Sequence, residues 1–209
     1  MVRISPPMSA LGSTAPRLGP TVARRLGLLG AVAASALALG ACTLNHKLAR
    51  PHYADTEAQY VSAGNVTYQV QITRALNPFA TEDSAYLHGV APPLLTLRPD
   101  QLWFGVFLWA KNQTQHLVTT TDTFTIRDSA GIIYRPTPID AYSNPWGWTA
   151  QHLAPGGTEP GADTMASYGP TGGGLILFKL NDSVYSNRPL TLNIYAPGQT
   201  VPTRVSLDL

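Results

Sequence analysis

The side chains best suited to metal binding are scattered along the chain. The five histidines stand far apart, and none belongs to an H-x-H or H-E-x-x-H pattern: His46, His52, His88, His116 and His152. Zinc sites in proteins usually show closely spaced ligand pairs. The sequence therefore predicts no metal site and no cofactor, with a site assembled from distant residues as the alternative.

Four aspartates stand in segments rich in turn residues: Asp122, Asp128, Asp140 and Asp163. Such carboxylates commonly accept hydrogen bonds from backbone amides two residues on and so close a turn. Paired in space they could instead serve acid–base chemistry or bind calcium, although their spacing matches no EF-hand. We expect turn caps.

The chain has no pattern typical of a catalytic nucleophile or a phosphate-binding loop. It contains no G-x-S-x-G and no S-x-x-K, and the three glycines at 172–174 lack the Lys and Ser or Thr that would follow in a phosphate loop. We predict that the protein is not an enzyme.

The segment before Cys42, the single cysteine, has the composition of an export signal. Residues 26–41 carry no charge, Arg24 and Arg25 precede them, and small residues stand at their end. These are the parts of a secretory signal peptide. The 16 residues are short of the roughly 20 that a membrane-spanning helix needs, so a cleaved signal is favoured. The arginine pair leaves twin-arginine export open beside general secretion, although Ala23 stands where that motif usually has Ser or Thr.

The end of this segment, Leu39, Gly40, Ala41 and Cys42, resembles the lipobox of bacterial lipoproteins. The resemblance implies that the thiol of Cys42 takes a diacylglyceryl group and that residues 1–41 are removed as the signal peptide. It also implies an extracytoplasmic protein of the cell envelope, attached to a membrane through its lipid.

The positive charge of the chain belongs to its first part. Four of the 14 basic residues lie in residues 1–25, whereas all 12 acidic residues follow Cys42, so the mature part has a formal charge of 10 − 12 = −2. The mature part has no cluster of Lys and Arg, and we expect no nucleic-acid partner.

The mature part shows the period of β-strands. Residues 65–73 alternate apolar and polar side chains, which is typical of a half-buried strand. Residues 102–110 are apolar on both faces, which favours a central strand. Further short strands are expected at 122–127, 132–135, 148–153, 175–180, 190–196 and 203–209.

About seven to eight short strands separated by turns predict an all-β fold, an immunoglobulin-like antiparallel β-sandwich, with a closed barrel as the alternative. We place the sandwich domain at 63–209. Residues 42–62, which show no clear period, are expected to be the lipidated cysteine and a flexible tether.

Parts of the predicted domain resemble a large group of bacterial secreted and lipid-anchored immunoglobulin-like domains. The similar segments are the apolar strand ending in Asn at 103–112, the hairpin 124–134 with Asp128 and Gly131, and the Leu-Ala-Pro-Gly at 153–156 before the next apolar strand. The chain departs from the group in its Gly- and Pro-rich insertion at 157–174. The resemblance implies fold and location, and no shared catalytic residues.

A loop rich in proline carries most of the candidate binding residues. Tyr142, Trp146 and Trp148 follow Tyr134 within fifteen residues. Exposed aromatic rings on a loop can stack on sugars or hold peptide chains, so these three form the candidate binding surface. The alternative is that the rings close the open end of the sandwich.

Together these patterns predict a lipid-anchored envelope protein that acts as a non-enzymatic binding or structural module. The expected partner is another envelope protein or cell-wall glycan. The alternative is an envelope-acting hydrolase with a convergent active site that the sequence does not reveal.

Overall fold

The computed structural model of the chain describes residues 51–208, which belong to one compact unit. The predicted lipobox residues Leu39, Gly40, Ala41 and Cys42 lie outside the described residues. No helix in the described part has the length and apolar character needed to cross a membrane.

The described strands are β1 (Tyr53–Ala54), β2 (Tyr60–Ala63), β3 (Val66–Leu76), β4 (Gln101–Asn112), β5 (Val118–Thr119), β6 (Phe124–Arg127), β7 (Ile133–Tyr134), β8 (His152–Leu153), β9 (Thr158–Glu159), β10 (Gly174–Asn181), β11 (Leu190–Ile194) and β12 (Thr203–Leu207). The short helices are α2 (Thr81–Ser84), η1 (Ala85–Leu87), α3 (Pro92–Leu95), α4 (Met165–Tyr168) and η2 (Asp182–Tyr185).

A separate two-stranded sheet pairs β5 with β8, and two larger sheets form the domain, which confirms the predicted all-β sandwich. One has the order β1-β12-β11-β6-β7 and is called sheet A; the other has the order β10-β4-β3-β2, with β9 also paired to β4, and is called sheet B. The pairs are antiparallel except β1 and β12, which run parallel. Side chains from both sheets form the main core.

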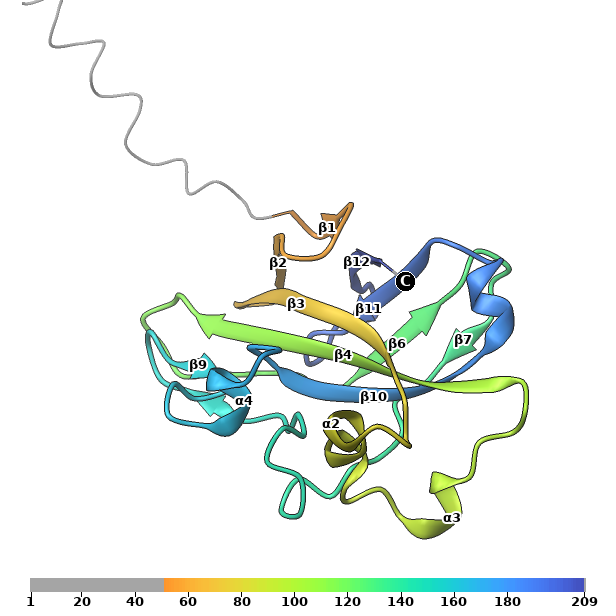
Figure 1. Ribbon diagram of the computed structural model, residues 1–209. Helices are drawn as coiled ribbons and strands as arrows, with labels where there is room; N and C mark the ends of the chain where they lie inside the picture. Colours follow the sequence, from red (N-terminus) through yellow and green to blue (C-terminus); the bar gives the residue numbers. More distant parts are fainter. Residues whose placement is uncertain (1–50, 209) are drawn as a thin grey trace, which may run out of the picture. The chain divides into compact units, whose positions relative to one another are not determined.

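The sequence of strand β4 is apolar on both faces because other parts of the domain cover both faces (Figure 1). Phe104, Val106 and Leu108 point into the main core. Trp103 and Phe107 point the other way and pack in a second cluster with residues of η1. This second cluster confirms the prediction of a central strand that is apolar on both sides.

The β6–β7 hairpin closes as the sequence predicts. The carboxylate of Asp128 accepts a hydrogen bond from the amide of Ile132 (2.8 Å), and Gly131 has a φ of +89°, a region that favours glycine. Asp128 is therefore a turn cap, as expected.

Two predicted boundaries need correction. Strands β1 and β2 lie within the segment expected to be a flexible tether, because β1 pairs with the distant β12 and β2 with β3. The folded part thus begins no later than Tyr53 and not near residue 63. The strand expected at 148–153 is regular only at β8, since its beginning bonds to β10 instead: Gly147 forms an isolated bridge with Leu175, and the amide of Trp148 donates to the carbonyl of Leu175.

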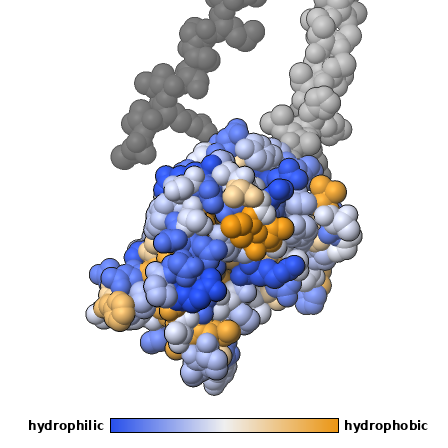
Figure 2. All heavy atoms as spheres, turned by 90° about the vertical axis from the view of Figure 1, so that its right-hand side faces the viewer, coloured by the Kyte–Doolittle hydropathy of each residue, from blue (hydrophilic) through white to orange (hydrophobic). Residues whose placement is uncertain are grey.

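One face of the domain is mostly polar. On the face drawn in Figure 2, hydrophilic residues predominate and hydrophobic residues lie in a few separate patches. The candidate sites are therefore the hollows that side chains line.

Candidate functional site

The loop between β7 and β8, residues 135–151, leaves sheet A and follows the edge of β10 in sheet B before it reaches β8, which pairs with β5. The amide of Thr137 donates to the carbonyl of Leu177 in β10 (2.7 Å), and the amide of Trp148 donates to the carbonyl of Leu175 (2.9 Å). In return the amide of Leu175 donates to the carbonyl of Trp146 (2.6 Å). These bonds cover the free edge of β10 and hold the loop in one place.

Asn144 fixes the middle of this loop. Its side-chain amide is buried and donates to the carbonyls of Tyr86 and His88, both at 2.9 Å, while its oxygen accepts from the amide of Trp146 at 3.0 Å. A buried amide with its partners in place holds the loop against the segment after η1. No signal in the sequence distinguishes this Asn from an ordinary loop residue.

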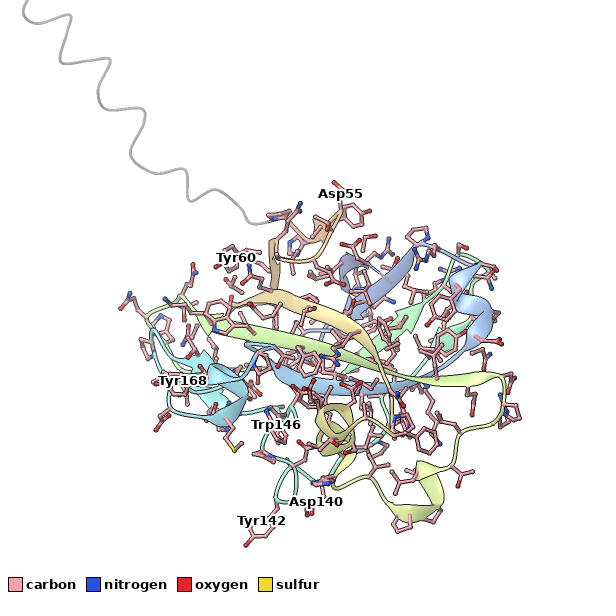
Figure 3. All side chains as sticks on the ribbon, viewed as in Figure 1. Asp55, Tyr60, Asp140, Tyr142, Trp146 and Tyr168 are labelled. Atoms are coloured by element: carbon pink, nitrogen blue, oxygen red, sulfur yellow. The ribbon has the colours of Figure 1, made fainter. Side chains whose placement is uncertain are left out.

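The three candidate rings do not form one exposed surface. Tyr142 is 99% exposed and projects from the far end of the loop, whereas Trp146 lies closer to the sheet (Figure 3). Trp146 is half-buried and packs edge-on against Tyr86, with ring centroids 5.2 Å apart. The expectation that these three rings together form an exposed binding surface is therefore wrong.

Trp148 is half-buried on the other side of the chain and packs on the main core. Its ring centroid lies 6.0 Å from that of Phe124 and 6.3 Å from that of Tyr68, and its indole N–H donates to the carbonyl of Thr121 at 2.8 Å. The alternative, that the rings close the end of the sandwich, fits Trp148, whose ring packs on the main core against Phe124 of one sheet and Tyr68 of the other. Trp146 packs instead in the second cluster, on the outer side of sheet B.

Two open hollows flank the segment 146–149 and form the candidate site. The first, of about 550 Å³, lies between the loop, the start of β6 and β10. The second, of about 360 Å³, lies between the loop, β9 and the segment around α4. Trp148 and Thr149 line both hollows, so the indole ring of Trp148 contributes to the wall of each. We call this pair of hollows the Trp148 cleft.

Glu159 is the titratable residue of the cleft that sequence reasoning missed. It pairs with Ala110, which in turn pairs with Tyr68, so the three side chains follow one row of sheet B. The small Ala110 leaves room for the carboxyl and the phenol on either side of it. Glu159 is only 3% exposed, and its Oε2 has no hydrogen-bond partner among the described residues.

The surroundings of Glu159 change its acidity. Burial raises its pKa to about 7, although hydrogen bonds from Thr120, from the backbone of Thr149 and from Gln151 act in the opposite direction. The nearby Tyr68 also has a raised pKa, chiefly through burial. A carboxyl of this kind accepts or donates a hydrogen bond near neutral pH, which suits binding of a polar group.

Several of the other residues considered from the sequence have local partners. Asp140 accepts hydrogen bonds from the amide of Tyr142 and the hydroxyl of Ser143, which lower its pKa and make it a turn cap. His52 and His152 bind within the fold, with Ser62 and Thr119 respectively. Among residues 51–208 no three His, Cys, Asp or Glu side chains are grouped as a metal site would need.

Comparisons with known proteins give similarities of structure only. No protein-family model matches the chain. No curated protein matches its sequence. Among solved structures, the chain is similar to the yjhA protein from Bacillus subtilis, with a TM-score of 0.44, 12% identity, and coverage of 74% of this chain and 99% of that one.

A second solved structure is that of a Bacillus subtilis protein described as a "putative lipoprotein (ycdA)". The TM-score is 0.43 with 12% identity, and the match covers 73% of this chain and 38% of that one. At this level of similarity, no residue of the Trp148 cleft is carried over from either protein.

Proposed function

We propose that this chain is a lipoprotein of the bacterial cell envelope and that its sandwich is a non-enzymatic binding module. The observation that carries the proposal is the position of its single cysteine: Cys42 follows Leu39, Gly40 and Ala41 at the end of an uncharged segment. In lipoproteins this thiol forms a thioether with diacylglycerol. Two acyl chains give stable attachment, whereas one attaches only marginally.

The distance from Cys42 to the fold supports a domain held close to the membrane. The first described strand begins at Tyr53, eleven residues after Cys42. A fully extended chain of that length spans at most about 40 Å. A module on such a short connection meets partners that lie next to the membrane.

The Trp148 cleft is the surface that we assign to the partner. Binding sites are typically concave, with apolar and aromatic walls and a few polar groups that fix orientation. The larger hollow combines Trp148, Phe124 and Ile139 with Asp122 and Thr149. This mixture suits a sugar ring of cell-wall glycan or a short segment of another envelope protein.

The anchoring is tested by replacing Cys42 with Ser. The variant should move from the membrane fraction to the soluble or unprocessed pool, whereas Thr43→Ser, next to the lipobox, should behave as the wild type. Membrane attachment of Cys42→Ser equal to that of the wild type would exclude a lipid anchor on this residue.

The cleft is tested by filling it from its rim. Thr149 is exposed and lines both hollows, so Thr149→Arg should obstruct them without disturbing the core. Ser129→Arg, at an exposed turn outside the cleft, adds the same side chain as a control. Crosslinking in cells, together with co-sedimentation on purified cell wall, should show a partner that the control keeps and Thr149→Arg loses. Equal binding by both variants would rule out the cleft as the binding site.

A further inference from the structure

A second hollow surface lies on the side of sheet A that faces away from the core. It is a groove of about 270 Å³ across β12, β11 and β6, and it shares no lining residue with the Trp148 cleft. The residues that line it are Thr125, Arg127, Ile133, Thr191, Asn193, Tyr195, Pro202 and Arg204. None of these residues carries a carboxylate.

The strand register sets two polar rows on this surface. Asn193 pairs with Arg204 on one side and with Thr125 on the other. Two residues along, Thr191 pairs with Arg127. Side chains two residues apart share a face of a strand, so the two arginines stand on the same face with hydroxyl and amide groups between them.

Both arginines are exposed and uncompensated. The ion pairs of the described residues join Arg74 to Asp83 and Arg98 to Asp100, so neither Arg127 nor Arg204 takes part in one. Two arginines without an ion-pair partner therefore line one groove on a mature chain whose formal charge is −2.

Carboxylates at the ends of these strands have partners of their own, and Asp128, next to Arg127, accepts hydrogen bonds from the amide of Ile132 and the hydroxyl of Tyr134. Asp208 accepts a hydrogen bond from the hydroxyl of Thr56 at 3.2 Å, and Asp55 is hydrogen-bonded with Tyr53. None of these carboxylates lines the groove. The groove thus keeps its positive charge.

We infer that this groove, which we call the arginine groove, binds the phosphate groups of anionic lipids in the membrane that carries the protein. Guanidinium groups bind phosphate through paired, charge-assisted hydrogen bonds. Thr191 and Asn193 supply neutral polar groups between the two arginines. An anion is therefore the ligand that the groove fits.

The path of the chain identifies lipid as the source of that anion. Tyr53 of β1 pairs with Arg204, and the amide of Arg204 donates to the carbonyl of His52 at 2.9 Å. The chain that comes from Cys42 therefore enters the fold directly beside the groove. This step rests on the proposed lipid at Cys42. The eleven residues from Cys42 to Tyr53 span at most about 40 Å, which keeps the groove within reach of the headgroups.

The test measures binding of the unlipidated mature chain to vesicles, so that attachment through the acyl chains does not contribute. The protein is the chain 42–209 with Cys42→Ser, which retains every residue of the two described clusters. It is titrated with phosphatidylcholine vesicles that contain phosphatidylglycerol, with vesicles of phosphatidylcholine alone, and separately with inorganic phosphate.

We expect binding to the anionic vesicles only, weakened by salt, because exposed charges are screened. Arg127→Gln and Arg204→Gln should each weaken it about fivefold, and the double variant about 25-fold. The matched control, Arg98→Gln with Lys111→Gln, removes the same charge from outside the groove and should weaken it by less than twofold. Replacing both Arg127 and Arg204 with Lys keeps the positive charge, so this variant should retain part of the binding that the double Gln variant loses.

Two results would overturn the inference. One is vesicle binding that the groove variants and the control variant change equally, since the attraction would then be general. The other is binding of inorganic phosphate at the groove without any binding to anionic vesicles, which would make the ligand a free anion. The lipid on Cys42 is measured independently by mass, so failure of the groove and failure of the anchor give different results.

Discussion

Replacing Glu159 with Gln should change how the stability of the domain depends on pH. The carboxyl is buried beside Tyr68, and its pKa is raised from 4.5 to about 7. As pH rises between these values, the unfolded chain loses this proton while the folded chain keeps it. The wild type therefore loses stability across this window, and above the folded pKa the loss is complete. The amide of Gln does not titrate, so the variant does not lose stability in this way.

The magnitude follows from the size of the shift. One pKa unit corresponds to 1.36 kcal/mol, so a rise from 4.5 to about 7 amounts to about 3 kcal/mol. For a chain of this size, about 3 kcal/mol corresponds to roughly 6–12 °C in Tm. The cost of fitting an amide in place of the acid is the same at every pH. It cancels when the two ends of the window are compared.

The assay is urea unfolding, followed by tryptophan fluorescence, at about pH 4 and about pH 8, which lie on either side of the window. The difference in free energy of unfolding between Glu159→Gln and wild type should be about 3 kcal/mol more favourable to the variant at the higher pH. Asp163→Asn removes an exposed acid four residues further on and should leave the pH dependence unchanged. Burial also raises the pKa of Glu57, but this residue is present in all three proteins, so its contribution cancels when they are compared.

The same pH dependence for Glu159→Gln and wild type would refute this reasoning. It would mean that the carboxyl ionises in the folded protein as readily as in the unfolded chain, with a partner for Oε2.

Three further substitutions test the placement of the loop, each by the free energy of unfolding. Asn144→Ala should cost about 2–4 kcal/mol, because it leaves the buried carbonyl of Tyr86 and the part-buried carbonyl of His88 without donors; a cost below about 1 kcal/mol would contradict the anchoring role. Trp148→Ala should cost about 3 kcal/mol or more through lost packing and the lost indole bond, and a neutral effect would place the ring outside the core. Tyr142→Ala should change stability by no more than about 0.5 kcal/mol, so a larger loss would show that this exposed ring is packed.

The strands that the sequence predicted are those with a period of their own. β3 and β6 alternate in polarity, and β4 and β10 are long apolar segments, so each carries its signal within a few consecutive residues. Burial of one or both faces produces these patterns directly. Their positions therefore followed from local sequence.

The elements that the sequence did not reveal depend on distant partners. β1 has two residues and exists because β12, about 150 residues away, offers it an edge. β9 has two residues inside a Gly- and Pro-rich insertion and is a strand only through β4. Neither is long enough to show a period.

The candidate site was only partly predictable for the same reason. The density of aromatic residues located the loop, but the bonds to β10 decide which way Trp146 and Trp148 face. Glu159 reads as a turn residue between Thr158 and Pro160, and only its register opposite Ala110 buries it. Local sequence located the loop, whereas tertiary pairing decided which of its side chains line the cleft.

The central claim, a lipid-anchored envelope protein, is tested most directly by the mass of the N-terminal peptide of the mature protein, isolated from bacterial membranes. The proposed function predicts a peptide that begins at Cys42, lacks Ala41 and all residues before it, and carries a diacylglyceryl group on its sulfur. An unmodified thiol at Cys42 in the membrane-bound mature protein would contradict it.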